Sequence, residues 1–142
     1  MRISAMLLCL CSAPLMFAGC GGGKAYDGPK RVPVTGTVTF KGQPVSGGML
    51  SLIPENGELG ASGGEIIDGQ INIPEEKGPN LGTYRVAVYW HQPTGEKKKD
   101  PDTGEEIDVV KQVIPQEYNG ATKLSATFTG EAESDKLDIN IE

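Results

Sequence analysis

The sequence predicts an all-β protein whose body is a single antiparallel β-sandwich of about seven short strands. Apolar and polar residues alternate with a period of two in run after run of the chain. The 142 residues include 20 glycines and 10 prolines, which supply the turns that short strands require. No segment between the runs has a helical period long enough for a helix. The apolar faces of the strands must therefore be buried between layers of sheet.

The first twenty residues predict export rather than structure. Arg2 gives a positive start, and the apolar stretch 5–18 is shorter than a membrane-spanning helix. It ends in Phe17-Ala18-Gly19-Cys20, which resembles the lipobox of bacterial lipoproteins. Residues 1–19 are therefore predicted to be a lipoprotein signal peptide and Cys20 the lipidated residue. The alternative is an ordinary signal peptide cleaved after a small residue, with Cys20 incidental.

The positions of the three cysteines are consistent with lipidation of Cys20. Cys9, Cys11 and Cys20 all lie at or before the expected cleavage point. The mature chain would keep Cys20 alone, and acylation would remove an exposed thiol from an oxidising compartment. Several acyl chains would hold the protein on a membrane. Residues 20–33 have no periodicity and are predicted to be a flexible tether, so the sequence places the protein in the cell envelope, on the periplasmic face or the cell surface.

Residues 34–142 form the predicted sandwich domain, with seven runs as its strands. In chain order the runs are 34–41, 49–53, 71–73, 84–90, 109–114, 123–129 and 137–142. The run 109–114 has the weakest alternation. Turn residues bound each run, and Asp68-Gly69 and Asn119-Gly120 are dipeptides typical of tight hairpin turns, because glycine accepts a positive φ.

These strands and turns resemble the carboxypeptidase-regulatory-like, or transthyretin-like, domains. The matching segments are 34–40, 41–45, 48–55, 64–73 and 82–88. Ile71 stands where that family often has phenylalanine, and Gly82-Thr83-Tyr84 resembles the tyrosine corner of Greek-key sandwiches. Nearly the whole mature chain resembles the small lipoproteins of planctomycete-type bacteria. The resemblance implies a fold and a location, and it implies no biochemical activity.

Charge and composition narrow the function classes. Asp and Glu number 19 against 13 Lys and Arg, for a net charge of -6, which argues against a nucleic-acid partner. His91 is the only histidine, and the chain has no nucleophile-elbow pattern. We therefore expect no enzymatic activity, no cofactor and no metal site.

Tyr89, Trp90 and His91 form the first candidate binding surface, at the end of a predicted strand. They could make an exposed aromatic cluster for a sugar or a protein partner. The alternative, which we favour, places Trp90 in the core and Tyr89 on an ordinary sheet face.

The segment 92–108 is the longest predicted irregular insertion and the second candidate surface, because loops carry specificity on rigid sandwiches. Asp100 and Asp102 suggest a calcium loop together with Glu105, although the segment does not match an EF-hand. A solvated loop is the simpler interpretation. The basic block 95–99 could pair with the acidic residues that follow it across a long hairpin.

The leading hypothesis is a non-catalytic envelope lipoprotein that acts as an interaction or structural module. Its partners would be the membrane, through the N-terminal lipid, and an unknown envelope protein or polysaccharide. The alternative is a carbohydrate-binding module at the cell envelope that uses the Tyr89-Trp90 region. Almost no residues of the chain support an enzymatic function.

Overall fold

The computed structural model describes residues 27–131 and 135–142. The predicted signal peptide, Cys20 and the first part of the tether lie outside the described residues. The described chain contains ten strands and two short 3-10 helices. They are β1 (Val34–Phe40), β2 (Gln43–Pro44), β3 (Gly48–Pro54), β4 (Ser62–Ile67), β5 (Gln70–Ile73), η1 (Glu75–Lys77), β6 (Gly82–Tyr89), β7 (His91–Lys99), β8 (Glu106–Gln112), η2 (Gln116–Tyr118), β9 (Ser125–Phe128) and β10 (Lys136–Ile141).

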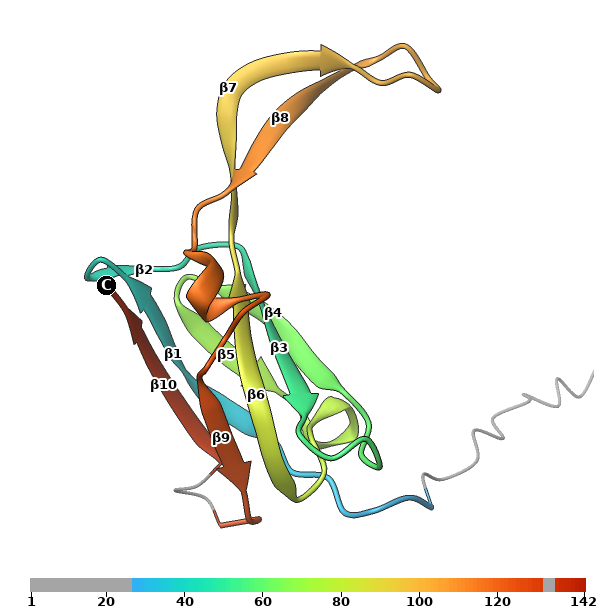
Figure 1. Cartoon of the computed structure of the whole chain (residues 1–142), viewed down its shortest axis with the longest axis vertical. Coiled ribbons are helices and arrows are strands. Elements are labelled where there is room, and N and C mark those ends of the chain that lie inside the picture. Colours follow the sequence, from blue (N-terminus) through green and yellow to red (C-terminus); the bar gives the residue numbers. More distant parts are fainter. Residues whose placement is uncertain (1–26, 132–134) are drawn as a thin grey trace, which may run out of the picture.

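The strands form one large curled sheet and one small sheet (Figure 1). The large sheet has the order β10-β1-β5-β4-β3-β6-β9, with β2 paired to β1, and the small sheet is β7-β8. The all-β sandwich prediction is confirmed. The pairing differs from the prediction at one place, because β1 and β10 run parallel. The chain reaches β10 by crossing from β9, at the opposite edge of the sheet, and it enters beside β1 in the same direction.

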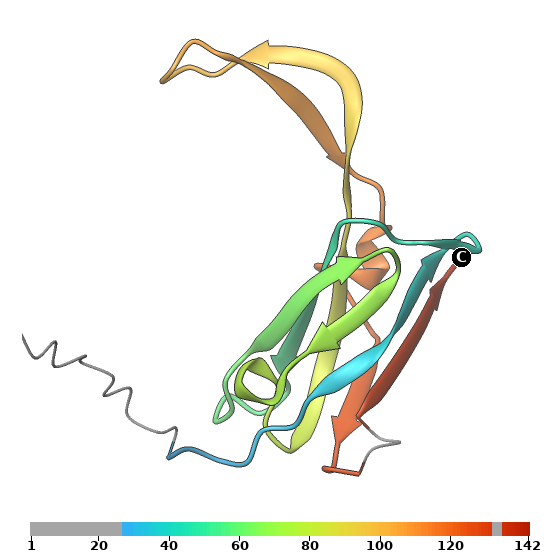
Figure 2. The ribbon, with the colours of Figure 1, turned by 180° about the vertical axis from the view of Figure 1, so that it is seen from behind.

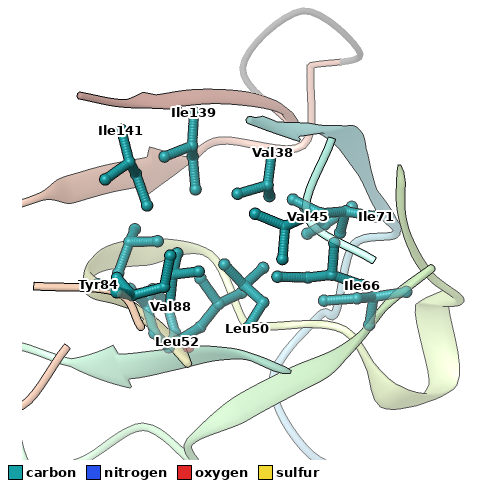
Figure 3. Packing of buried hydrophobic residues seen from close by; sticks show 14 of the residues in the cluster. Val38, Val45, Leu50, Leu52, Ile66, Ile71, Tyr84, Val88, Ile139 and Ile141 are labelled. Carbon is teal, nitrogen blue, oxygen red and sulfur yellow. The ribbon is translucent and has the colours of Figure 1, made fainter. Parts of the chain in front are cut away.

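The curled sheet buries one apolar side of each of its longer strands. Figure 3 shows Ile139 and Ile141 of β10 and Val38 of β1 pointing toward Leu50 and Tyr84 of the opposing layer. Val38, Leu50, Tyr84 and Ile141 have no exposed surface. The predicted alternation in these strands is thus the alternation between core and solvent.

The tyrosine corner forms as the sequence predicts. The Tyr84 hydroxyl accepts a hydrogen bond from the backbone N–H of Asn80 at 3.0 Å. The Tyr84 ring packs edge-on against Phe128 of β9, with ring centroids 5.7 Å apart. One buried side chain therefore fixes the entry to β6 and joins β6 to β9 within the core.

The two predicted hairpin turns have different outcomes. Asp68 and Gly69 both have positive φ, at 49° and 76°, and they join β4 to β5 in a tight turn. The prediction for Asn119-Gly120 is wrong. Asn119 ends η2 with a φ of -131°, and its buried side-chain amide donates hydrogen bonds to the carbonyl oxygens of Ile114 and Pro115 at 3.0 and 3.1 Å.

The strand prediction missed β4. Gly63 and Gly64 interrupt its alternation, yet β4 pairs with both β3 and β5. A Cβ on Gly64 would lie 2.9 Å from Cγ1 of Ile73, so a close approach between neighbouring strands requires glycine there.

The folded body begins before residue 34. Arg31 forms an isolated bridge with Asn80, and its guanidinium donates a hydrogen bond to the carbonyl oxygen of Glu76. Val32 is 2% exposed and belongs to the core. The last residues assigned to the tether are therefore attached to the body.

Candidate functional site

The most prominent feature of the molecule is a hairpin that stands away from the body. In Figures 1 and 2 the ribbon of β7 and β8 rises from the end of β6 and curves to one side. Its strands pair with each other from His91↔Gln112 to Lys99↔Glu106, with an irregularity between Pro93 and Lys97. The prediction of an irregular loop over 92–108 is wrong, because most of the segment is an extended ribbon.

The sequence prediction of charge pairing across this hairpin is confirmed at one position. The Nζ atom of Lys97 lies 3.9 Å from Oδ1 of Asp108, and 60% of each side chain is exposed. Exposed pairs of this kind contribute little to stability because water screens them.

Asp100 and Asp102 lie in the turn at the hairpin tip. Oδ1 of Asp100 accepts hydrogen bonds from the backbone N–H groups of Asp102 and Thr103, each at 2.9 Å. These bonds, from Thr103 first and then Asp102, lower the pKa of the Asp100 carboxyl below its ordinary value. Within the described ranges, no group of three His, Cys, Asp or Glu side chains is placed to hold a metal ion. The observed role of Asp100 is to close the turn.

The three residues of the predicted aromatic surface separate at the base of the hairpin. Trp90 packs against the core, with its ring edge-on to Phe40 and the centroids 6.4 Å apart. Its indole Nε1 is buried, with no hydrogen-bond partner among the described residues. Tyr89 and His91, the residues on either side, instead line a hollow on the outer face. A flat Tyr-Trp platform does not form.

Gln112 fixes the base of the hairpin to the body. Its side-chain Oε1 accepts hydrogen bonds from the backbone N–H of Trp90 at 2.9 Å and of Ile114 at 3.1 Å. One amide oxygen therefore ties the start of β7 to the end of β8, where the ribbon leaves the sheet.

The outer hollow extends from the hairpin base along the outer face of β3, β4 and β5. The part beside Tyr89 and His91 has a volume of about 340 Å³, and the adjoining part has about 930 Å³. Met49, Glu65 and Ile67 line both parts. We call this surface the outer groove.

Sequence reasoning missed the apolar residues of the outer groove. Met49 is 46% exposed and Ile67 is 62% exposed. The signal was present in Ile66-Ile67, because two successive residues of one strand face opposite sides of a sheet. One of the two isoleucines had to face outward.

Comparisons with known proteins assign no family. No family model matches the chain, and no curated protein matches it. A solved structure with some similarity is a 9R-lipoxygenase from Cyanothece PCC8801, at 11% identity and a TM-score of 0.35. The match covers 84% of this chain and 18% of the lipoxygenase, so the chain spans less than a fifth of that protein's length. Similarity at this level assigns neither a fold nor an activity.

Among residues 27–131 and 135–142, no helix is long and apolar enough to span a bilayer.

Proposed function

We propose that this chain is a non-catalytic lipoprotein of the bacterial cell envelope whose sandwich body presents a binding surface for another envelope component. The observation that carries the proposal is the β7–β8 hairpin, which pairs with no strand of the large sheet and projects from the body. A segment that neither completes the core nor covers it is a natural place for recognition.

The outer groove adds an apolar component to this surface. Met49 and Ile67 present exposed apolar side chains on the face that leads to the hairpin base. Exposed apolar patches of this kind, rimmed by polar side chains, are typical of interaction sites on proteins. The lipobox-like ending of the first twenty residues supports attachment of this surface to a membrane through Cys20.

A protein partner fits the surface better than a polysaccharide does. Carbohydrate-binding surfaces use aromatic faces as flat platforms, and Trp90 packs its ring toward Phe40 instead. Of the two rings Tyr89 and Trp90, only that of Tyr89 lines the outer groove.

The test is crosslinking of the tagged chain in intact cells of its own host, followed by mass spectrometry. A reproducible protein partner, captured by the parent chain and lost in an Ile67→Lys variant, would support the proposal. Leu81→Lys is the matched control, because Leu81 is 38% exposed and precedes β6 at the end away from the hairpin. Recovery of envelope polysaccharide without a protein would favour the carbohydrate-binding alternative.

A further inference from the structure

The outer edge of β8 is a continuous row of backbone groups that face away from the hairpin. At the tip of the hairpin, the carbonyl of Glu105 accepts a hydrogen bond from the N–H of Asp100 at 2.8 Å. At its base, the N–H of Val113 donates a hydrogen bond to the carbonyl of Trp90 at 2.9 Å. Backbone groups alternate in direction along a strand, so the odd-numbered residues face β7. Residues 106, 108, 110 and 112 then direct their N–H and C=O groups to the open edge. No described strand pairs with that edge.

Residues on the outer edge of β7 hinder pairing with a further strand, whereas those on the outer edge of β8 do not. Pro93 and Lys97 occupy outward-facing positions on β7, opposite Val110 and Asp108. Proline offers no N–H, and Gly95, with a φ of 83°, lies in the irregular stretch between them. Prolines, lysines and bulges are the features that protect sheet edges from pairing. The sequence of β8, EIDVVKQ, has no proline, no glycine and three β-branched residues that favour a strand.

An isolated two-stranded hairpin is marginal in water, and three or more strands are needed for independent stability. The β7–β8 ribbon makes its ladder with no strand of the large sheet, so added strands would stabilise it. We propose that two copies of this chain associate by antiparallel pairing of β8 with β8, which forms a four-stranded sheet in the order β7-β8-β8-β7. This inference rests on the proposed function and deepens it, because it names a second copy of the chain as the partner of the β8 edge. Anchoring of both copies on one membrane would raise their effective concentration.

The sequence of β8 specifies one register for this pairing. A two-fold axis at Val109, the central residue of the seven in β8, lets the whole strand overlap its copy. Asp108 then lies opposite Val110 and Glu106 opposite Gln112, and all four of these residues have outward-facing backbone groups. No like charges lie directly opposite one another, and the two Asp108 carboxylates are diagonal neighbours across the axis. Lys111 lies opposite Ile107 and diagonal to Glu105, which is a favourable cross-strand arrangement.

The neighbouring two-fold registers are poorer. An axis at Asp108 would place two carboxylates directly opposite each other, which is destabilising. An axis at Val110 would place Glu106 opposite Ile114, which is 3% exposed and part of the body core. Charge and available length therefore both favour the axis at Val109.

Cysteine crosslinking of the full chain tests the register. In the proposed pair the two Val109 residues are a non-hydrogen-bonded pair with Cα atoms about 4.5 Å apart, a separation that a disulfide can bridge. We expect Val109→Cys to give a linked dimer on a non-reducing gel after oxidation of intact cells. Thr103→Cys is the control, because the tip of the hairpin lies beyond the paired segment. Equal linkage at both positions, or none above the parent chain at Val109→Cys, would overturn the proposal.

A pair of proline variants gives a second test of the edge itself. Val110→Pro removes an outward-facing N–H from β8, and Lys97→Pro removes one from β7. When each change is combined with Val109→Cys, the first should abolish the linked dimer and the second should preserve it. Loss of the dimer in both variants, or in neither, would contradict pairing through β8.

The outcomes separate this inference from the proposed function. If the hairpin cysteines give no dimer while the crosslinked parent chain still captures a different protein through the outer groove, self-pairing is wrong and the interaction module stands. If the dimer forms and no other component is captured, self-pairing stands, and the outer groove lacks the partner that we propose for it.

Discussion

Tyr84 shows how one residue connects two parts of the fold. Its ring lies in the core against Phe128, and its hydroxyl accepts the N–H of Asn80 at the entry to β6. Because Tyr84 is completely buried, removal of the hydroxyl would take this hydrogen bond away from the interior of the protein. The residue contributes to stability through packing and through a buried hydrogen bond together.

We expect Tyr84→Phe to lower the free energy of unfolding by about 1–3 kcal/mol, because it removes one partner of a buried hydrogen bond. Urea unfolding followed by tryptophan fluorescence would measure this change. Tyr89→Phe is the control, because Tyr89 lies on the outer face and should change stability far less. Equal stability of Tyr84→Phe and the parent would show that the corner hydrogen bond is dispensable.

Gly69 is the second residue at which backbone geometry dictates the side chain. Its φ is 76°, and a Cβ there would lie 2.7 Å from Cβ of Pro44. We expect Gly69→Val to destabilise the body by about 1–3 kcal/mol through backbone strain, measured as a fall in melting temperature. A Cβ on Gly57 would meet nothing within 4 Å, so Gly57→Val should be nearly neutral. A similar melting temperature for both variants would argue against strain at Gly69.

At the scale of elements, the pairing of β1 with β10 carries a surface network. Oδ1 of Asp138 accepts hydrogen bonds from the hydroxyl and the N–H of Thr37, at 2.8 and 3.0 Å. Oδ2 of Asp138 lies 2.8 Å from Nζ of Lys136. The bond from Lys136, followed by that from the Thr37 hydroxyl, lowers the pKa of Asp138, and the same partnership raises the pKa of Lys136.

This network predicts a dependence of stability on acid pH. A carboxyl whose pKa is lower in the folded state than in the unfolded state stabilises the fold above the unfolded value, and the effect is lost as the pH falls through the folded value. Between about pH 6 and pH 3, the parent should lose more stability than Asp138→Asn does. Urea midpoints at the two pH values would measure the difference. Asp102→Asn, on the hairpin tip, should follow the parent, and an Asp138→Asn variant that does so as well would contradict the assignment.

The hairpin tip gives a prediction about calcium. Asp100 uses Oδ1 to accept two backbone N–H groups, so we expect millimolar calcium to leave the melting temperature of the protein unchanged. Magnesium at equal ionic strength is the control. A rise of several degrees with calcium that Asp100→Asn abolishes would establish a metal site there.

Elements with regular alternation could be predicted from sequence, and those formed by pairing alone could not. The core sides of β1, β6 and β10 follow directly from their alternating residues. By contrast, β7 contains Pro93, Gly95 and three lysines, residues that disfavour strands, and it becomes extended because β8 lies beside it. Gly63 and Gly64 likewise interrupt the alternation of β4, so this strand was not predicted. Among the residues that line the outer groove, the sequence named Tyr89 and His91 as candidates, whereas Met49 and Ile67 required knowledge of which strand sides face outward.

At the scale of the whole molecule, the proposed function predicts a dependence on Cys20. Cys20→Ala removes the thiol that lipidation requires, so the variant should accumulate as an unprocessed precursor without acyl label. Metabolic labelling with a fatty acid, with Cys9→Ala as the matched control, would measure this. Unchanged labelling of Cys20→Ala would contradict lipidation at that residue.

The position of β1 in the large sheet has a mechanical consequence. β1 is the first strand of the body, yet it lies between β10 and β5, with ladders from Thr35↔Lys136 to Phe40↔Ile141 on one side and from Val34↔Ile73 to Thr37↔Gln70 on the other. A pull on the N-terminal segment along β1 acts across the hydrogen bonds of both ladders, which lie roughly perpendicular to the strand in the antiparallel β1–β5 pair and slanted in the parallel β1–β10 pair. Such a force shears both ladders at once instead of opening them one bond at a time. A pull along β1 is therefore opposed by both ladders together.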